Sequence, residues 1–230
     1  MTQKAPKSAA PKPKTAKKVV TKAPAAEKPK KSTGGAAGLA AEIIVDSRAP
    51  QRVAEQAALL FEGAPTAATQ AARTLDEIAK QKTELLVPIV PELTKAIFSK
   101  NKRVAQMAAD ALPQLARTAP ARVARHLDAL KGGFLEASPE GKDGLVRTFS
   151  ALCVASVAYQ KKLEPVLAEA LEEADGKTLS AWCTVVLPAL KGEPHARARA
   201  VVESRLDRIP RATAQEIADF LGIRLRARYR

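Results

Sequence analysis

Ten lysines in the first 38 residues carry the clearest chemistry in the sequence, and Glu27 is the only acid among them. An ammonium group binds phosphate oxygens by releasing counterions and does not read the bases. The segment therefore predicts sequence-independent binding to a nucleic acid. The ten are Lys4, Lys7, Lys12, Lys14, Lys17, Lys18, Lys22, Lys28, Lys30 and Lys31.

The two ends of the chain hold most of its positive charge. The formal net charge of the 230 residues is +14 and the pI is about 10.0. Residues 1–38 contribute +9 of that charge, while residues 39–230 contain 28 basic and 23 acidic residues. This balance predicts a polyanionic partner, and DNA is favoured over RNA. The basic residues near the C-terminus are Arg224, Arg226, Arg228 and Arg230.

The remaining reactive side chains lack the spacing of an active site. His126 and His195 have no carboxylate or cysteine at metal-ligand spacing, and Cys153 and Cys183 form no CxxC motif. We expect these cysteines to be reduced core thiols. The glycine-rich stretches "GGAAG" and "KGG" lack the Gly-Lys-Ser/Thr of a phosphate-binding loop. The sequence thus predicts no enzyme activity, no cofactor, no metal and no small-molecule substrate.

Apolar runs are too short for membrane insertion or secretion. No run reaches 18 residues, and the N-terminus has no apolar signal core. We expect no membrane partner. The expected location is the cytoplasm, associated with the nucleoid, or the nucleus if the source is eukaryotic.

Composition divides the chain into a tail and a helical body. Residues 1–38 contain five prolines and little to bury, which predicts a disordered tail that ends in a flexible joint, Ser32 to Gly38. From Leu39 onward apolar residues recur at helical spacing, as in Val53, Ala57 and Leu60. No segment alternates like a strand. The body is predicted to be all-α.

An internal repeat organises this body. Residues 89–115 can be laid over residues 163–190 at an offset of 74 to 75, which is two periods of about 37. Less regular units cover residues 51–80, 122–155 and 193–221. Each unit predicts a helix, a short polar turn and a second helix. Stacking is required because a single amphipathic pair cannot bury its own apolar face.

The period and the helix pairs resemble HEAT repeats. The resemblance covers residues 50–221, and its marks are Pro91 and Pro165 in the first helices and small-residue-rich second helices such as "RVAQMAADAL". It implies an α-solenoid of about four to five helix pairs in a domain of residues 39–221.

One enzyme family requires comparison. Bacterial DNA alkylation-repair glycosylases resemble the chain in size and in their HEAT-like pairs, and they use an aspartate framed by tryptophans. Here the single tryptophan, Trp182, takes the place of Met107 in the repeat, which predicts a core position. No aspartate lies within one helical turn of Trp182, so a glycosylase is the least favoured alternative.

The C-terminal segment is predicted to be a terminal capping helix followed by an arginine-rich end, residues 222–230. Thr213 and Glu216 have the spacing of a capping box, and Gly222 is placed to end the helix. "TAQEIADFLGI" resembles the start of a helix-turn-helix, but too few residues follow Ile223 for a recognition helix.

Basic residues also recur in the body, where they could line one edge of the solenoid. They lie in "SKNKR" (Ser99 to Arg103), "RVAR" (Arg122 to Arg125), Lys161 with Lys162, and "HARAR" (His195 to Arg199), interrupted by the acids of residues 169–175. An ordinary mixed-charge surface is an equally good interpretation. The candidate phosphate-binding residues of the body are Lys100, Lys102, Arg103, Arg122 and Arg125.

These patterns favour a non-enzymatic architectural DNA-binding protein, associated with a nucleoid or with chromatin. The tail resembles those of linker histones and lysine-rich bacterial nucleoid proteins, which implies phosphate binding. The alternative is a protein-interaction scaffold that uses the concave face of the solenoid.

Overall fold

A computed structural model describes residue 1, residues 35–62 and residues 64–225. The described part is all-α, with no strand, and its helices belong to the unit formed by residues 32–230. This confirms the predicted fold class. The elements are α1 (Ala36–Val45), α2 (Ala49–Glu62), α3 (Pro65–Gln81), the 3-10 helix η1 (Thr83–Ile89), α4 (Val90–Ala96), α5 (Lys102–Thr118), α6 (Pro120–Ala124), α7 (Leu127–Gly132), α8 (Pro139–Ala155), α9 (Val157–Glu173), α10 (Gly176–Ala189), α11 (Gly192–Arg205) and α12 (Arg211–Leu221).

Short polar residues begin several of these helices. The side chain of Asn101 accepts hydrogen bonds from the backbone N–H groups of Arg103 and Val104 and so begins α5. The side chains of Ser138 and Asp175 cap α8 and α10 in the same way. These caps fix where the second helices α5, α8 and α10 start.

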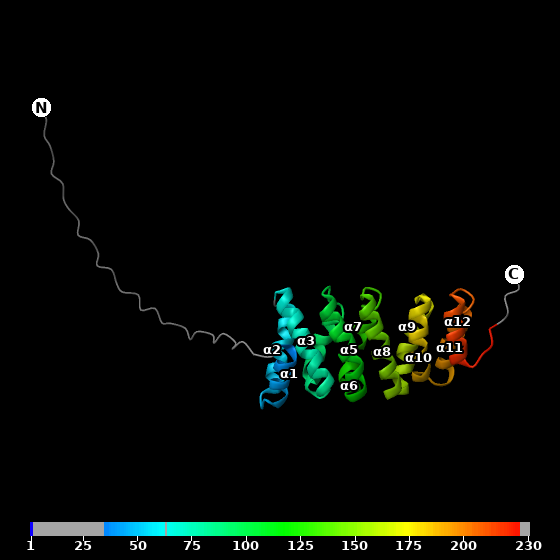
Figure 1. Cartoon of the computed structure of the whole chain (residues 1–230), viewed down its shortest axis with the longest axis horizontal. Helices are drawn as coiled ribbons and strands as arrows, with labels where there is room; N and C mark the ends of the chain where they lie inside the picture. Colours follow the sequence, from blue (N-terminus) through cyan, green and yellow to red (C-terminus); the bar gives the residue numbers. More distant parts are fainter. Residues whose placement is uncertain (2–34, 63, 226–230) are drawn as a thin grey trace. The chain divides into compact units, whose positions relative to one another are not determined.

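The helices form five consecutive pairs preceded by α1 (Figure 1). The second helices α3, α5, α8, α10 and α12 each contact the next one along the chain, and α1 contacts α3 in the same manner. The first helices are α2, η1 with α4, α6 with α7, α9 and α11. The predicted repeat is confirmed at this level, because residues 89–115 and 163–190 correspond to α4–α5 and α9–α10.

The alternation of first and second helices creates two edges (Figure 1). We call the edge with the turns inside the pairs the hairpin edge; it comprises residues 59–62, 64–70, 93–107, 129–144, 170–181 and 202–216. We call the edge with the links between pairs the connecting edge; it comprises residues 42–54, 78–88, 115–125, 152–162, 186–197 and 218–225.

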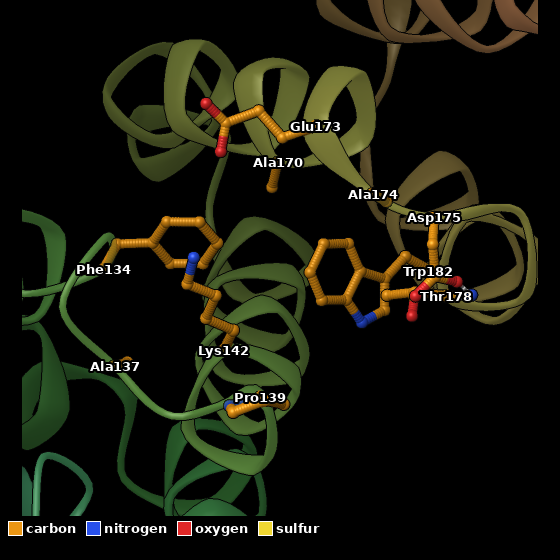
Figure 2. A pocket seen from close by; sticks show the side chains of 10 residues that line it. All are labelled: Phe134, Ala137, Pro139, Lys142, Ala170, Glu173, Ala174, Asp175, Thr178 and Trp182. Atoms are coloured by element: carbon orange, nitrogen blue, oxygen red, sulfur yellow. Dashed lines mark hydrogen bonds between the residues drawn. The ribbon is translucent and has the colours of Figure 1, made fainter.

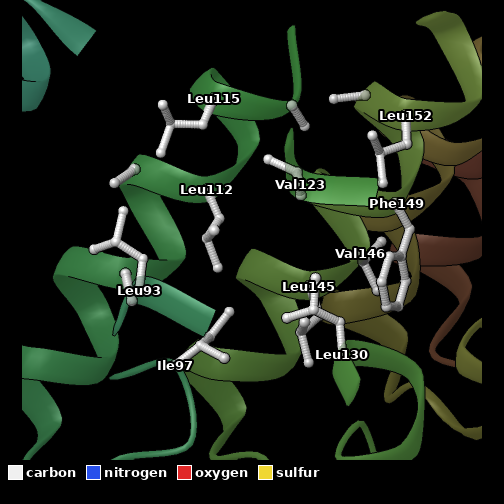
Figure 3. Close-up of a cluster of buried hydrophobic side chains, with 14 of the residues drawn as sticks. Leu93, Ile97, Leu112, Leu115, Val123, Leu130, Leu145, Val146, Phe149 and Leu152 are labelled. Carbon is white, nitrogen blue, oxygen red and sulfur yellow. The ribbon is translucent and has the colours of Figure 1, made fainter. Parts of the chain in front are cut away.

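Aliphatic side chains fill the space between the helices. Leu112, Leu145 and Phe149 are fully buried within one continuous cluster, part of which Figure 3 shows. Alanine and glycine allow the helices to approach closely, most of all where α5 meets α8. A Cβ at Gly144 would overlap the Cα and Cβ of Ala109, so only glycine fits there.

Buried polar groups join successive pairs. The side-chain amide of Gln160, which is 2% exposed, donates to the carbonyl oxygens of Cys153 and Ala189. Its Oε1 accepts a hydrogen bond from the backbone N–H of Lys191. One side chain therefore satisfies the ends of α8 and α10 and the start of the next link.

Local details differ from the sequence predictions at the two ends of the helical body. Helix α1 begins at Ala36, inside the segment predicted as a flexible joint, because "AAGLAA" consists mainly of helix-forming residues. Helix α12 begins at Arg211 after Pro210 and has no side-chain cap, so the predicted capping box is wrong. Gly222 does end α12, with φ of 68°.

The prolines of the first helices also act differently from one another. Pro165 lies inside α9, as predicted. Pro91 instead lies in the first turn of α4, and together with Pro88 it divides the first helix of its pair into η1 and α4.

The α5–α8 contact predicts a large effect of a single methyl group. We expect Gly144→Ala to lower the free energy of unfolding by about 1–3 kcal/mol, because the helices must separate. The control is Gly38→Ala in α1, where an added Cβ meets nothing within 4 Å; it should raise stability by about 0.5–1 kcal/mol. Urea unfolding followed by circular dichroism measures both, and equal effects would contradict the close contact.

The two cysteines should be inert in the folded protein. Burial raises the pKa of Cys153 and of Cys183 from the ordinary 9.0 to about 12. At mildly alkaline pH this leaves about a thousandfold less thiolate than an ordinary cysteine has. We expect both thiols to react with a thiol reagent only after unfolding in urea. Rapid labelling of the native protein would contradict their burial.

Candidate nucleic-acid interface

The two edges differ in charge. The hairpin edge contains ten basic and ten acidic residues, whereas the connecting edge contains twelve basic and five acidic residues. The body is nearly neutral as a whole, yet its excess of positive charge lies along one edge. The basic residues of the connecting edge are Arg48, Arg52, Lys80, Lys82, Arg117, Arg122, Arg125, Lys161, Lys162, Lys191, Arg197 and Arg224.

Eight of these twelve cations form no ion pair within the described part of the chain. Arg48, Arg52, Lys80 and Arg197 are paired with carboxylates. The others are exposed, and their charged ends can bind phosphate without first breaking a contact. We call these the free cations of the connecting edge: Lys82, Arg117, Arg122, Arg125, Lys161, Lys162, Lys191 and Arg224.

Arg122 and Arg125 lie beside a hollow of about 300 Å³. Its lining includes Val87, Pro88 and His126, so its wall is largely apolar and its cations lie on α6 and just beyond. A guanidinium group can hold two phosphate oxygens at once. Arg122 on α6 and Arg125 directly after it could therefore contact adjacent phosphates of a nucleic-acid strand.

The predicted basic turns do not form a single strip. "SKNKR" lies in the turn inside a pair and so belongs to the hairpin edge, whereas Arg122, Arg125, Lys161 and Lys162 lie on the connecting edge. The sequence prediction treated every basic turn as equivalent. The alternation of turns and links places them at opposite ends of the helices.

Two of the predicted phosphate-binding residues are engaged within the body. Lys102 Nζ lies 2.7 Å from Glu140 Oε1, and this contact raises the pKa of Lys102. Arg103 Nη2 lies 2.8 Å from Asp76 Oδ2, and the side chain of Asp76 is only 9% exposed. Both cations join neighbouring pairs. Lys100 is exposed at the hairpin edge and forms no ion pair with a described residue.

The "HARAR" segment is engaged in a similar way. Arg197 bridges Glu164 and Glu193, and its hydrogen bond to Glu164 raises its pKa. Arg199 contacts Glu203 and donates to the carbonyl oxygen of Leu221. These arginines stabilise the packing of α11.

Some predicted sites lie outside the described residues, and some cations of the connecting edge were not predicted from the sequence. The lysines from Lys4 to Lys31, and Arg226, Arg228 and Arg230, lie outside the described residues. Lys82, Arg117 and Lys191 were not predicted, because Arg117 and Lys191 are isolated in the sequence and Lys82 has only Lys80 nearby. Their position at the boundaries between repeats is the signal that could have found them.

Trp182 is 5% exposed, which confirms the predicted core position. Its indole Nε1 donates to Asp143 Oδ1 at 3.0 Å, and Asp143 also pairs with Arg147 at 2.8 Å. The fold thus brings to Trp182 an aspartate that lies 39 positions away. That carboxylate is already engaged by two partners.

Neither a metal-holding cluster nor a membrane-spanning helix is found in the part of the chain that the structure describes. No group of three or more histidine, cysteine, aspartate or glutamate side chains is placed there to hold a metal ion. Within the same residues, no helix is long and apolar enough to cross a membrane.

Comparisons with known proteins bear on the fold alone. No protein-family model and no curated protein matches the chain. Among solved structures, the crystal structure of an engineered protein from the Northeast Structural Genomics Consortium is similar, with a TM-score of 0.56 and 18% identity. The match covers 81% of this chain and 88% of the other.

The Asp76–Arg103 pair predicts that Arg103 acts in stability. We expect Arg103→Met to lower the free energy of unfolding by about 1–3 kcal/mol, because it removes the inter-pair partner of a nearly buried carboxylate. Lys100→Met, an equal change of charge in the same turn, should have no measurable effect. Thermal and urea unfolding test the pair of variants, and equal stabilities would refute the structural role.

Proposed function

We propose that the protein is a non-enzymatic, sequence-independent DNA-binding protein that shapes or organises nucleic acid. The single observation that carries this proposal is the placement of positive charge. Residues 1–38 have a net charge of +9, and the connecting edge of the body has twelve basic residues against five acidic ones. Such a protein would reside with the nucleoid in the cytoplasm, or in a nucleus.

The helical body supports this proposal through its repeat. Its pairs resemble HEAT repeats, and in a solenoid equivalent positions recur along a line. Cations recur at or near the links between pairs: Lys82 and Lys191 lie in links, and Arg122 and Lys161 lie near the starts of α6 and α9. A row of this kind suits a phosphate backbone, which is itself a row of regularly spaced charges.

The N-terminal segment and the connecting edge would contribute differently to binding, because they offer different numbers of phosphate contacts. The lysines of the N-terminal segment would supply most of the affinity, and the connecting edge would fix the direction of the nucleic acid along the body. Lysine and arginine contacts to phosphate do not themselves distinguish DNA from RNA. Duplex DNA is the proposed partner, and duplex RNA is the comparison that tests this choice.

The salt dependence of binding tests the two contributions separately. If six to eight lysines of residues 1–38 contact phosphates, log K should fall with log salt at a slope of about −5 to −7. A chain that begins at residue 35 should lose most of this slope. A mobility shift across a salt series measures it, and failure of the full chain to bind DNA at low salt would end the proposal.

A charge-matched comparison tests the connecting edge. We expect replacement of Arg122, Arg125, Lys161 and Lys162 by serine to make the slope less steep by about 3 to 4, because up to four phosphate contacts are lost. The control replaces Lys95, Lys100, Lys131 and Lys177 of the hairpin edge by serine and should leave the slope nearly unchanged. Equal changes in both variants would show that only net charge matters.

A further inference from the structure

A cavity of about 320 Å³ lies on the hairpin edge, between the third and fourth helix pairs. The ring of Phe134, from the segment after α7, and the indole of Trp182, from α10, lie on opposite sides of it (Figure 2). Ala137, Pro139 and Ala170 complete much of the lining. The space accepts one large apolar side chain between two aromatic walls.

Both aromatic walls are held in place by their neighbours. The hydrogen bond from Trp182 to Asp143 fixes the indole. Phe134 packs against Phe149 with ring centroids 6.4 Å apart. The Lys142 ammonium lies 5.8 Å from the centroid of the Phe134 ring. A ligand therefore meets a preformed site and does not need to order it.

The rim of the cavity on the α9 side is acidic. Residues 169–175 contain four carboxylates and no basic residue, and Glu173 and Asp175 line the cavity itself. All four are exposed, and the three glutamates form no ion pair among the described residues. The backbone N–H of Thr178 holds the pKa of Asp175 below its ordinary value, so this carboxylate stays ionised.

Charge decides which kind of partner suits the site. The lining carboxylates Glu173 and Asp175 repel a phosphate backbone, so nucleic acid is a poor occupant. Lys142 is the one cation that lines the cavity, and its ammonium is directed at Phe134. The α9 rim thus remains available for cations that flank an apolar residue.

We propose that this cavity binds a lysine- or arginine-rich segment of another protein, anchored by one large apolar side chain between Phe134 and Trp182. The cations beside that anchor lie against Glu172, Glu173 and Asp175. This surface is separate from the connecting edge. Through it the protein would join nucleic acid on one edge to a basic protein partner on the other.

Trp182 is the only tryptophan of the chain and reports directly on the cavity. The full chain, without nucleic acid, is titrated with a short lysine/alanine peptide that carries one central leucine. We expect a saturable change in the Trp182 emission. A peptide with alanine in place of leucine should bind about tenfold more weakly, and a peptide with glutamates in place of the lysines should not bind.

Charge-reversal variants separate the acidic rim from the overall charge. Glu172→Lys with Glu173→Lys should weaken binding of the leucine peptide by more than about tenfold. The matched control, Glu55→Lys with Glu84→Lys, adds the same charge away from the cavity and should retain affinity. Both variants should bind DNA at least as well as the parent chain, which keeps this test independent of the proposed nucleic-acid function.

Three results would overturn the proposal. The first is the absence of any saturable change with the leucine peptide. The second is equal affinity for the leucine and alanine peptides, because the apolar anchor would then play no part. The third is an equal loss in the two charge-reversal variants. Thermal unfolding of each variant shows that it remains folded during the measurement.

Discussion

The close approach of α5 and α8 is the constraint on which the rest of the body depends. Gly144 lies so near the backbone of Ala109 that no side chain fits between them. Small residues of this kind allow each second helix to lie directly against the next, in the order of the chain. The pairs then stack in one orientation, so that turns inside pairs collect at one edge and links between pairs at the other.

This regular stacking turns a nearly neutral body into one with a positive edge. At the hairpin edge, basic and acidic residues are equal in number, and Lys102 is used to join helix pairs. At the connecting edge, twelve basic residues stand against five acidic ones. The fold, more than the composition, therefore determines which surface attracts a polyanion and which surface attracts a cationic segment.

The sequence predicted the helix pairs well, because an apolar period of about 37 residues survives local irregularity. It also predicted the burial of Trp182, which replaces Met107 in the repeat. It could not predict interactions between distant residues. Arg103 meets Asp76 across 27 positions, and Trp182 meets Asp143 across 39. The opposite placement of the basic turns also required the three-dimensional alternation of turns and links.

Lysine acetylation footprinting of the full chain, with and without duplex DNA, tests the central claim most directly. If phosphates lie along the connecting edge, DNA should protect Lys82, Lys161, Lys162 and Lys191, while Lys95, Lys100 and Lys177 remain reactive. Mass spectrometry reads every site in one experiment, and the hairpin-edge lysines serve as internal controls. Equal protection at the two edges, or protection of the hairpin edge alone, would contradict the assignment of the connecting edge as the nucleic-acid interface.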